Sequence, residues 1–249
     1  MQSLIIQHIY YQKRPNLSIK KNNLIKATDE LGFHSSLKPL KNLYDQGYLS
    51  IINNVGYPNP NRSHFRSTDI WQTASNASEY LDTGWLGRYI EKHCKMPYSG
   101  IELDDSLSLI MKGKTMNGIA TKNPRVLFGN AQTPYFKKVL NHQSDAHLSE
   151  HNLGYLHKTM IDAKSSAKYI YETSKTFKSK LNYPKNPFGK QLKTTAEFIN
   201  SNLKSKVYYV SMGGYDTHAN QKNRQSSLLK TYSKSIEVLV DDLKQNNTF

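Results

Sequence analysis

The most regular hydrophobic pattern of the chain lies near its end. Apolar side chains recur every three or four positions from Leu228 to Leu243, which is the spacing of one face of an α-helix. In the helix predicted after Ser63, the apolar positions are Phe65, Ile70 and Trp71. Similar spacing, with start and stop residues such as Gly47, predicts further helices over about 35–47, 63–74, 84–94, 147–177 and 192–203.

Two apolar runs have the composition of buried strands. Residues 48–55 precede the turn-rich segment Gly56–Asn61, and residues 207–212 precede Gly213–His218. Strand-like and loop pieces lie in the less regular part of the chain, around 107–111 and 126–128. Helices that alternate with strands favour an open α/β sheet covered on both faces, in which ligands bind beyond the carboxyl ends of the strands.

The composition is that of a globular chain with few core-forming residues. Of 249 residues, 37% are hydrophobic, yet 17 Tyr, 8 Phe and 2 Trp distinguish the chain from a disordered polymer. The length favours one domain over residues 1–249. The 34 Lys and Arg against 19 Asp and Glu give a net charge of +15. Because these cations are scattered, a solvated basic surface is favoured over a polyanion-binding face, and nucleic acid is not the expected partner.

The chain contains one cysteine, Cys94, which excludes an internal disulfide and a cysteine-rich zinc module. No apolar run approaches the ~18 residues of a transmembrane helix. The N-terminal residues 1–14 lack both a basic region before the apolar run and a small-residue cleavage site. We therefore expect no membrane span and a cytoplasmic location for the chain as it stands.

The loop after the strand at 207–212 carries the first candidate site. Asp216 and His218 follow the pair Gly213 and Gly214, and glycines let a backbone approach a ligand or a neighbouring segment closely. A carboxylate and an imidazole two residues apart can reach one divalent cation or two adjacent ones. The alternative is that both residues are turn formers or exposed polar groups, and the residues alone leave both interpretations open.

The segment Asn61–Arg66 is the second candidate, with Ser63, His64 and Arg62 as the candidate catalytic residues. Ser63 at a helix start could be a nucleophile whose oxyanion is stabilised by the helix N-terminus, an arginine or a metal. Arg62 and Arg66 could bind phosphate or sulfate oxygens. The simpler alternative is that Ser63 caps the helix and the charged residues are solvated.

Two other arrangements of histidines are disfavoured. A triad of Ser63, His218 and Asp216 lacks the Gly-x-Ser-x-Gly turn that surrounds such a serine in α/β-hydrolases. Four histidines also cluster in the middle of the chain, His142, His147, His151 and His157. Because no glutamate follows His147, the zinc-protease pattern is absent, and an exposed polar helix face is predicted.

Several segments occur together, and in the same order, in one known family. They are Tyr11–Ile19, Gly32–His34, Gly56–Trp71, Thr83–Arg88, Phe188–Leu192 and Gly213–Ala219. The most specific are Arg62–Phe65 and Gly213–His218. In these segments the chain resembles domain-of-unknown-function family 1501, a sulfatase-like branch of the alkaline-phosphatase superfamily, and the resemblance covers nearly the whole chain.

This resemblance implies a three-layer α/β/α sandwich with an open, mostly parallel sheet, and descent from two-metal hydrolases. Asp216 and His218 would match metal-site positions, and Ser63 would lie in the region of the nucleophile. Divalent metal ions of the zinc, calcium or magnesium class would polarise a phosphate or sulfate ester and lower the pKa of the nucleophile. An anionic ester is therefore the expected substrate.

The chain departs from the family pattern at both ends. Met1 follows the point where members carry a Gly-Gly-Asn-Asp-Gly-type segment, and Phe249 precedes their Ser-Glu-Phe-Gly-Arg and Gly-Thr-Asp-His-Gly segments. The export signal of family members, which sends them to the periplasm, is absent as well. We therefore expect an incomplete α/β domain, a fragment without the N-terminal strand and the C-terminal metal-ligand segments, that is inactive as a hydrolase. The alternative is a non-catalytic binding or assembly protein on the same fold, and the sequence does not indicate its oligomeric state.

Overall fold

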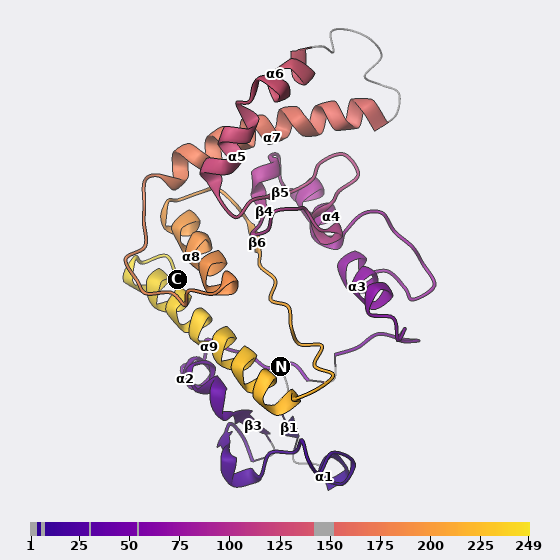
Figure 1. Cartoon of the computed structure of the whole chain (residues 1–249), viewed down its shortest axis with the longest axis vertical. Helices are drawn as coiled ribbons and strands as arrows, with labels where there is room; N and C mark the ends of the chain where they lie inside the picture. Colours follow the sequence, from indigo (N-terminus) through magenta and orange to yellow (C-terminus); the bar gives the residue numbers. More distant parts are fainter. Residues whose placement is uncertain (1–3, 6–7, 30, 54, 142–151) are drawn as a thin grey trace.

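The computed structural model describes residues 4–5, 8–29, 31–53, 55–141 and 152–249 (Figure 1). The α-helices are α1 (His8–Lys13), α2 (Lys38–Asp45), α3 (His64–Thr73), α4 (Trp85–His93), α5 (Pro124–Ala131), α6 (Pro134–Asn141), α7 (Asn152–Ser174), α8 (Pro187–Asn200) and α9 (Gln221–Gln245). The strands are β1 (Leu4–Ile5), β2 (Leu24–Lys26), β3 (Leu31–His34), β4 (Gly100–Glu102), β5 (Ile119–Ala120) and β6 (Val207–Tyr209). Short 3-10 helices are η1 (Lys21–Asn23), η2 (Ser35–Leu37), η3 (Pro97–Ser99) and η4 (Leu109–Met111).

A small parallel sheet forms the centre of the upper part of the molecule in Figure 1. Strand β4 pairs in parallel with β5 on one side and with β6 on the other. Ile101 of β4 lies opposite Ile119 of β5 and Tyr208 of β6. The strand predicted at 207–212 is therefore present, although its paired part ends at Tyr209.

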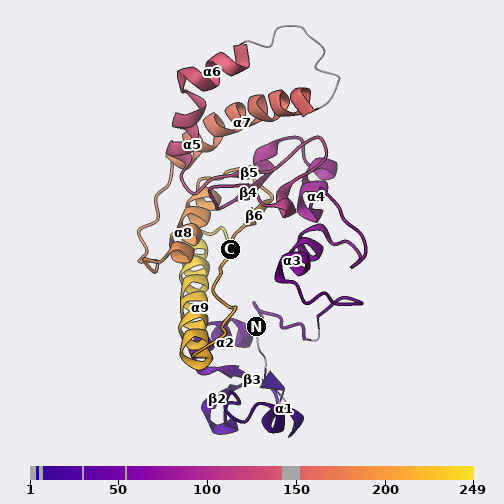
Figure 2. The same cartoon turned by 45° about the vertical axis from the view of Figure 1, so that its right-hand side comes forward.

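Helices cover both faces of this sheet. Alternate side chains of each strand point to opposite faces, so each face has its own set of packing partners. On one face, Ile101 and Leu103 pack with Ile170 of α7 and Phe198 of α8. A second cluster combines residues of α4 and η4 with partly buried Val207 of β6. Figure 2 shows α7 and α4 near the sheet, with α8 and α9 along one side of the molecule.

The predicted mixed α/β class is thus confirmed. The larger three-layer sandwich of the alkaline-phosphatase type stays a prediction, since the parallel sheet of the described residues has three strands. The predicted helices are confirmed as α2, α3, α4, α7, α8 and α9, with ends shifted by a few residues. Of the four clustered histidines, His157 lies on α7, and His142, His147 and His151 lie outside the described residues.

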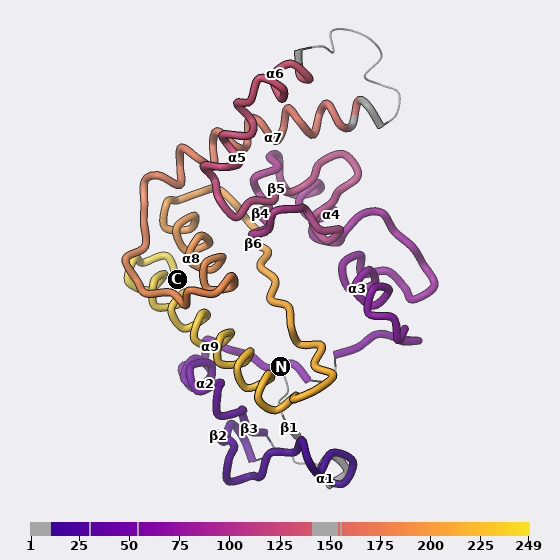
Figure 3. The backbone as a smooth tube through the Cα atoms, viewed as in Figure 1, coloured from indigo at the N-terminus to yellow at the C-terminus, as the bar shows by residue number. Residues whose placement is uncertain are grey.

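A second, antiparallel sheet near the N-terminus has the strand order β1-β3-β2. It was not predicted, because its strands are only two to four residues long. Phe33 of β3 is buried together with Leu37, with Leu40 of α2 and with Leu229 of α9. Figure 3 shows α9 running from this sheet toward α8, so the last helix connects the two parts of the core.

The strand predicted at 48–55 is wrong. Leu49 and Ile51 pack against the buried cluster around Leu40, but Ile52 and Val55 are exposed. No strand among the described residues pairs with this segment. Its apolar composition therefore reflects one-sided packing on α2 rather than a place inside a sheet.

The strand-like pieces at 107–111 and 126–128 are also wrong. The first contains η4, and the second lies within α5. Asn123 caps α5, since its side-chain oxygen accepts a hydrogen bond from the Arg125 N–H at 3.0 Å. Pro124 then occupies the first turn, where proline is tolerated. These two start signals override the apolar run that follows them.

Two predicted apolar positions of α3 point to solvent. Phe65 is 86% exposed and Trp71 is 61% exposed, whereas Ile70 is buried. Trp71 makes an edge-on contact with Trp85, with 6.5 Å between ring centroids. Helix α3 therefore contributes little to the core, and polar contacts of its first turn have to fix its position.

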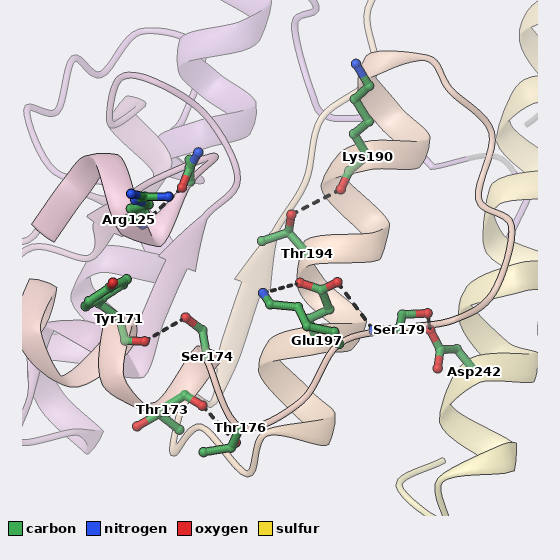
Figure 4. Close-up of polar contacts among 12 residues, drawn as sticks. Arg125, Tyr171, Thr173, Ser174, Thr176, Ser179, Lys190, Thr194, Glu197 and Asp242 are labelled. Carbon is green, nitrogen blue, oxygen red and sulfur yellow. Dashed lines mark hydrogen bonds and ion pairs between the residues drawn. The ribbon is translucent and has the colours of Figure 1, made fainter. Parts of the chain in front are cut away.

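A buried carboxylate joins α9 to the segment before α8. Asp242 is only 2% exposed. Its Oδ2 atom accepts hydrogen bonds from Ser179 Oγ at 2.5 Å and from Tyr183 Oη at 2.9 Å, and Oδ1 accepts one from Asn200 at 3.3 Å. Figure 4 shows Ser179 between Asp242 and Glu197 of α8. This network fixes the C-terminal half of α9 against α8.

None of the helices in the described ranges combines the length and the apolar character needed to cross a lipid bilayer.

Candidate metal centre

Two segments that are distant in the sequence meet at one cluster of side chains. His64 is the first residue of α3, whereas Asp216 and His218 lie in the loop between β6 and α9. The Nε2 atom of His64 is 3.5 Å from Oδ2 of Asp216, and Nε2 of His218 is 3.0 Å from Oδ1. One ligand atom from each residue lies within 4.8 Å of the other two. The structure therefore brings both predicted metal ligands together with one predicted catalytic residue.

The separations fit donors that share one cation. Nitrogen and oxygen ligands about 2.0–2.2 Å from a tetrahedral zinc ion lie roughly 3.3–3.5 Å from one another. The two nitrogen–oxygen separations, 3.0 and 3.5 Å, lie close to this range. They run to different oxygens of Asp216, and the three ligand atoms together lie within 4.8 Å of one another. Two imidazoles with one carboxylate also match the ligand types of catalytic zinc sites, which leave the fourth position to water or substrate. His64, Asp216 and His218 could therefore hold one divalent metal ion.

All three side chains are open to solvent, with exposed fractions of 75% for His64, 58% for Asp216 and 82% for His218. Without a metal, the contacts are two exposed ion pairs whenever the histidines are protonated, and such pairs contribute about 0–1 kcal/mol each. Ordering exposed side chains costs rotamer entropy. We therefore expect weaker metal binding than at a buried site, but free access for a substrate.

Hydrogen bonds within the preceding loop fix the start of α3. The Tyr57 hydroxyl accepts a hydrogen bond from the Asn61 N–H at 3.0 Å and bonds to Ser67 Oγ at 3.0 Å. Ser67 in turn donates to the Asn61 carbonyl at 2.7 Å. Because Ser67 belongs to the first turns of α3, this network holds the loop and the helix start, where His64 lies, in one arrangement.

Ser63 is the N-cap of α3. Its hydroxyl accepts a hydrogen bond from the Arg66 N–H at 3.3 Å, and its own N–H donates to Asn61 Oδ1 at 2.8 Å. Within the part of the chain that the structure describes, the hydroxyl makes no hydrogen bond to His218. A Ser63–His218–Asp216 triad is therefore not formed here, and the role of Ser63 as a nucleophile stays a prediction.

The two arginines of the loop have different environments. Arg66 is only 7% exposed, and its Nη2 atom donates to the carbonyls of Ala77, at 3.0 Å, and of Glu79. Its guanidinium also lies 3.9 Å from the ring centroid of Tyr80. The suggestion that Arg66 binds phosphate or sulfate is thus wrong, because its guanidinium is buried and bonded to backbone carbonyls of the same chain. Arg62 is exposed and makes no ion pair with any described residue.

The other loop depends on a glycine for its course. Gly214 has a φ of +94°, which L-residues with a side chain rarely adopt, whereas a side chain at Gly213 would meet open space. The close approach of this glycine pair to a ligand therefore stays a prediction. Gly214 gives the loop a turn, and Asp216 and His218 follow this turn in the sequence. Figure 1 shows the extended course of the loop from β6 to α9.

Comparisons of the chain with protein-family models, with curated proteins and with solved structures find no match. The resemblance to domain-of-unknown-function family 1501 therefore continues to rest on the residues of the sequence alone.

The sequence grouped His64 with Ser63 and Arg62 as a candidate catalytic residue. The structure places it beside Asp216, within reach of the two predicted metal ligands. Its place after a turn-rich loop was a signal of function, but only the fold shows that this loop meets the one that carries Asp216.

Proposed function

We propose that this chain binds one divalent metal ion through His64, Asp216 and His218, in a centre that acts on phosphate or sulfate esters. The observation that carries the proposal is the convergence of two imidazole nitrogens on one carboxylate from two separate segments. Zinc is the favoured ion because imidazole suits zinc, whereas calcium and magnesium prefer sites made of oxygen ligands. The three-layer sulfatase-like fold belongs to this proposal.

The residues around the centre have separate tasks in it. A bound metal would polarise an ester oxygen and lower the pKa of a coordinated water. Three side-chain ligands would leave one position of a four-coordinate ion for water or substrate, and the exposure of these side chains gives an ester free access. Arg62 is exposed two residues before His64 and can place its guanidinium on an oxyanion of the substrate.

A second function, metal binding without catalysis, is favoured by the contacts of two side chains. The only serine among the candidate catalytic residues, Ser63, caps α3, and Arg66 is buried against internal carbonyls. In this arrangement Ser63 is not prepared as a nucleophile, and hydrolysis would depend on a coordinated water. A non-catalytic binding protein on the same fold would need the metal centre, but it would not need a coordinated water that attacks an ester.

Cobalt(II) tests the proposal, because tetrahedral cobalt with nitrogen and oxygen ligands absorbs visible light. Chelator-treated protein is titrated with Co²⁺, and we expect visible bands that saturate near one equivalent. His64→Ala, Asp216→Ala and His218→Ala should each lose these bands. His93→Ala, which removes an exposed histidine of α4, serves as the matched control and should keep them. Bands that persist in His64→Ala would contradict the proposed ligand set.

Hydrolysis assays then separate the two functions. The zinc-loaded protein is incubated with p-nitrophenyl phosphate and p-nitrophenyl sulfate. Turnover that depends on zinc and disappears in His64→Ala supports the hydrolase. Stoichiometric metal binding without turnover of either ester supports the non-catalytic function.

A further inference from the structure

A cavity of about 800 Å³ lies between the N-terminal segment and the first turns of α9. Its volume is within the range of about 300–1,000 Å³ that is usual for small-molecule sites. Three cationic side chains line it: Arg14, Lys20 and Lys222. Among the described residues, neither aspartate nor glutamate lines it, and none of the three cations makes an ion pair. The cavity thus presents positive charge that no described carboxylate of the chain neutralises.

The other lining residues add hydrogen-bonding groups and a small apolar floor. Polar side chains come from the N-terminal segment, from η2 and from α9, and they include Asn23, Ser35 and Gln225. Leu229 is buried and lies at the cavity. Among the described residues, no Phe, Tyr or Trp lines the cavity, and its only aromatic ring is the imidazole of His34. Its chemistry suits a small anion whose body carries hydroxyl groups.

His34 adds one neutral donor. Its Nδ1 atom accepts a hydrogen bond from the Ser36 N–H at 3.1 Å. The ring proton is therefore on Nε2, which can donate to a ligand oxygen. Burial lowers the pKa of His34, which favours the neutral ring.

The walls of the cavity are held together by contacts outside it. Tyr11 donates to the Ile19 carbonyl at 3.0 Å and closes the N-terminal turn. Ser36 bonds through its hydroxyl to Ser226 Oγ at 3.1 Å, and Ser233 donates to the Ser36 carbonyl at 2.7 Å. These bonds join η2 to α9, two of the elements that line the cavity.

We infer that this cavity binds a sugar phosphate or a sugar sulfate, with Arg14, Lys20 and Lys222 as the residues that hold its oxyanion. Guanidinium and ammonium groups donate charge-assisted hydrogen bonds to such oxygens. The amino-terminal turn of α9 adds a favourable dipole at the same place. The inference stands independently of the proposed metal centre, because none of His64, Asp216 and His218 lines the cavity.

Calorimetric titration with glucose 6-phosphate, glucose 6-sulfate and glucose tests the inference. The protein is the full chain with His218→Ala, treated with chelator, so that the metal centre cannot contribute. We expect at least one of the two anionic sugars to bind near one equivalent, and glucose to bind at least tenfold more weakly. The stronger of the two anions identifies the oxyanion. Equal binding of glucose, or no binding of either anion, would overturn the inference.

Charge variants locate the site. Arg14→Gln, Lys20→Gln and Lys222→Gln should each weaken binding of the anionic sugar by about tenfold, as expected for a lost charge-assisted hydrogen bond. Lys222→Arg keeps the charge and should retain most of the affinity. Arg125→Gln and Lys137→Gln remove exposed cations from α5 and α6, and they should change nothing. Equal losses in these controls would assign the binding to the overall charge and contradict the inference.

Discussion

The Nε2 atom of His64 lies 3.5 Å from the Oδ2 atom of Asp216, across the gap between α3 and the loop that precedes α9. The two residues belong to segments that only the folded chain brings together. A metal bound between them therefore stabilises the folded state, because the unfolded chain offers no such arrangement.

Zinc should accordingly raise the melting temperature of the protein. At a free zinc concentration 100 times the dissociation constant, the expected stabilisation is about 2.7 kcal/mol. His64→Ala should remove this increase, since the metal would then no longer link α3 to the loop before α9. Thermal unfolding followed by circular dichroism, with and without zinc, measures the effect. An equal zinc-dependent increase in His64→Ala would show that the metal binds elsewhere.

Arg66→Ala should destabilise the protein by about 2–4 kcal/mol, because it removes a buried guanidinium and its hydrogen bonds to the carbonyls of Ala77 and Glu79. The same change should weaken zinc binding, since it loosens the helix start that carries His64. Arg62→Ala is the matched control at an exposed position and should alter stability by less than about 0.5 kcal/mol. Urea unfolding and zinc titration of both variants test this. Similar stability of the two variants would refute the structural role of Arg66.

Asp242→Ala should cost about 2–3 kcal/mol of stability, because the hydroxyls of Ser179 and Tyr183 would lose their buried acceptor. Its neighbour Asp241 is exposed, so Asp241→Ala provides a control of the same charge change on the same helix. The free energies of unfolding in urea should separate the two variants clearly. If both lose the same small amount, the network around Asp242 does not hold α9.

The pKa of Tyr183 is raised above its usual value of about 10, mainly by burial and further by the hydrogen bond to Asp242. The folded protein therefore holds the phenolic proton more tightly than the unfolded chain does. This contribution to stability is fully present below about pH 10 and is lost as the pH rises above it. Tyr183→Phe should thus lose less stability between pH 9 and pH 11 than the wild-type protein. The control is Tyr135→Phe, at an exposed tyrosine, which should follow the wild-type curve.

The sequence predicted the helices better than the strands, for a physical reason. A long amphipathic helix such as α9 repeats its apolar spacing over many turns, whereas β4 and β5 have only two or three residues each. Such short strands form only because neighbouring strands and helices cover them. Residues 48–55 show the converse, because their apolar run packs one-sidedly on α2 without any partner strand among the described residues.

The candidate site was predicted in its parts but not as a whole. Asp216 and His218 were identified from their loop, and His64 from another loop, yet no spacing in the sequence joins the two. The different roles of Arg62 and Arg66 were equally hidden, since only burial shows that one of them binds internal carbonyls. The cations Arg14, Lys20 and Lys222 were missed, because residues distant in the sequence share one cavity.

The central claim is that His64, Asp216 and His218 together hold one metal ion. Equilibrium dialysis against buffered zinc, followed by elemental mass spectrometry, measures the zinc bound per chain. We predict close to one zinc per wild-type chain and almost none in His64→Ala, with His93→Ala unchanged. Wild-type protein without zinc, or His64→Ala with as much zinc as the wild type, would contradict the account.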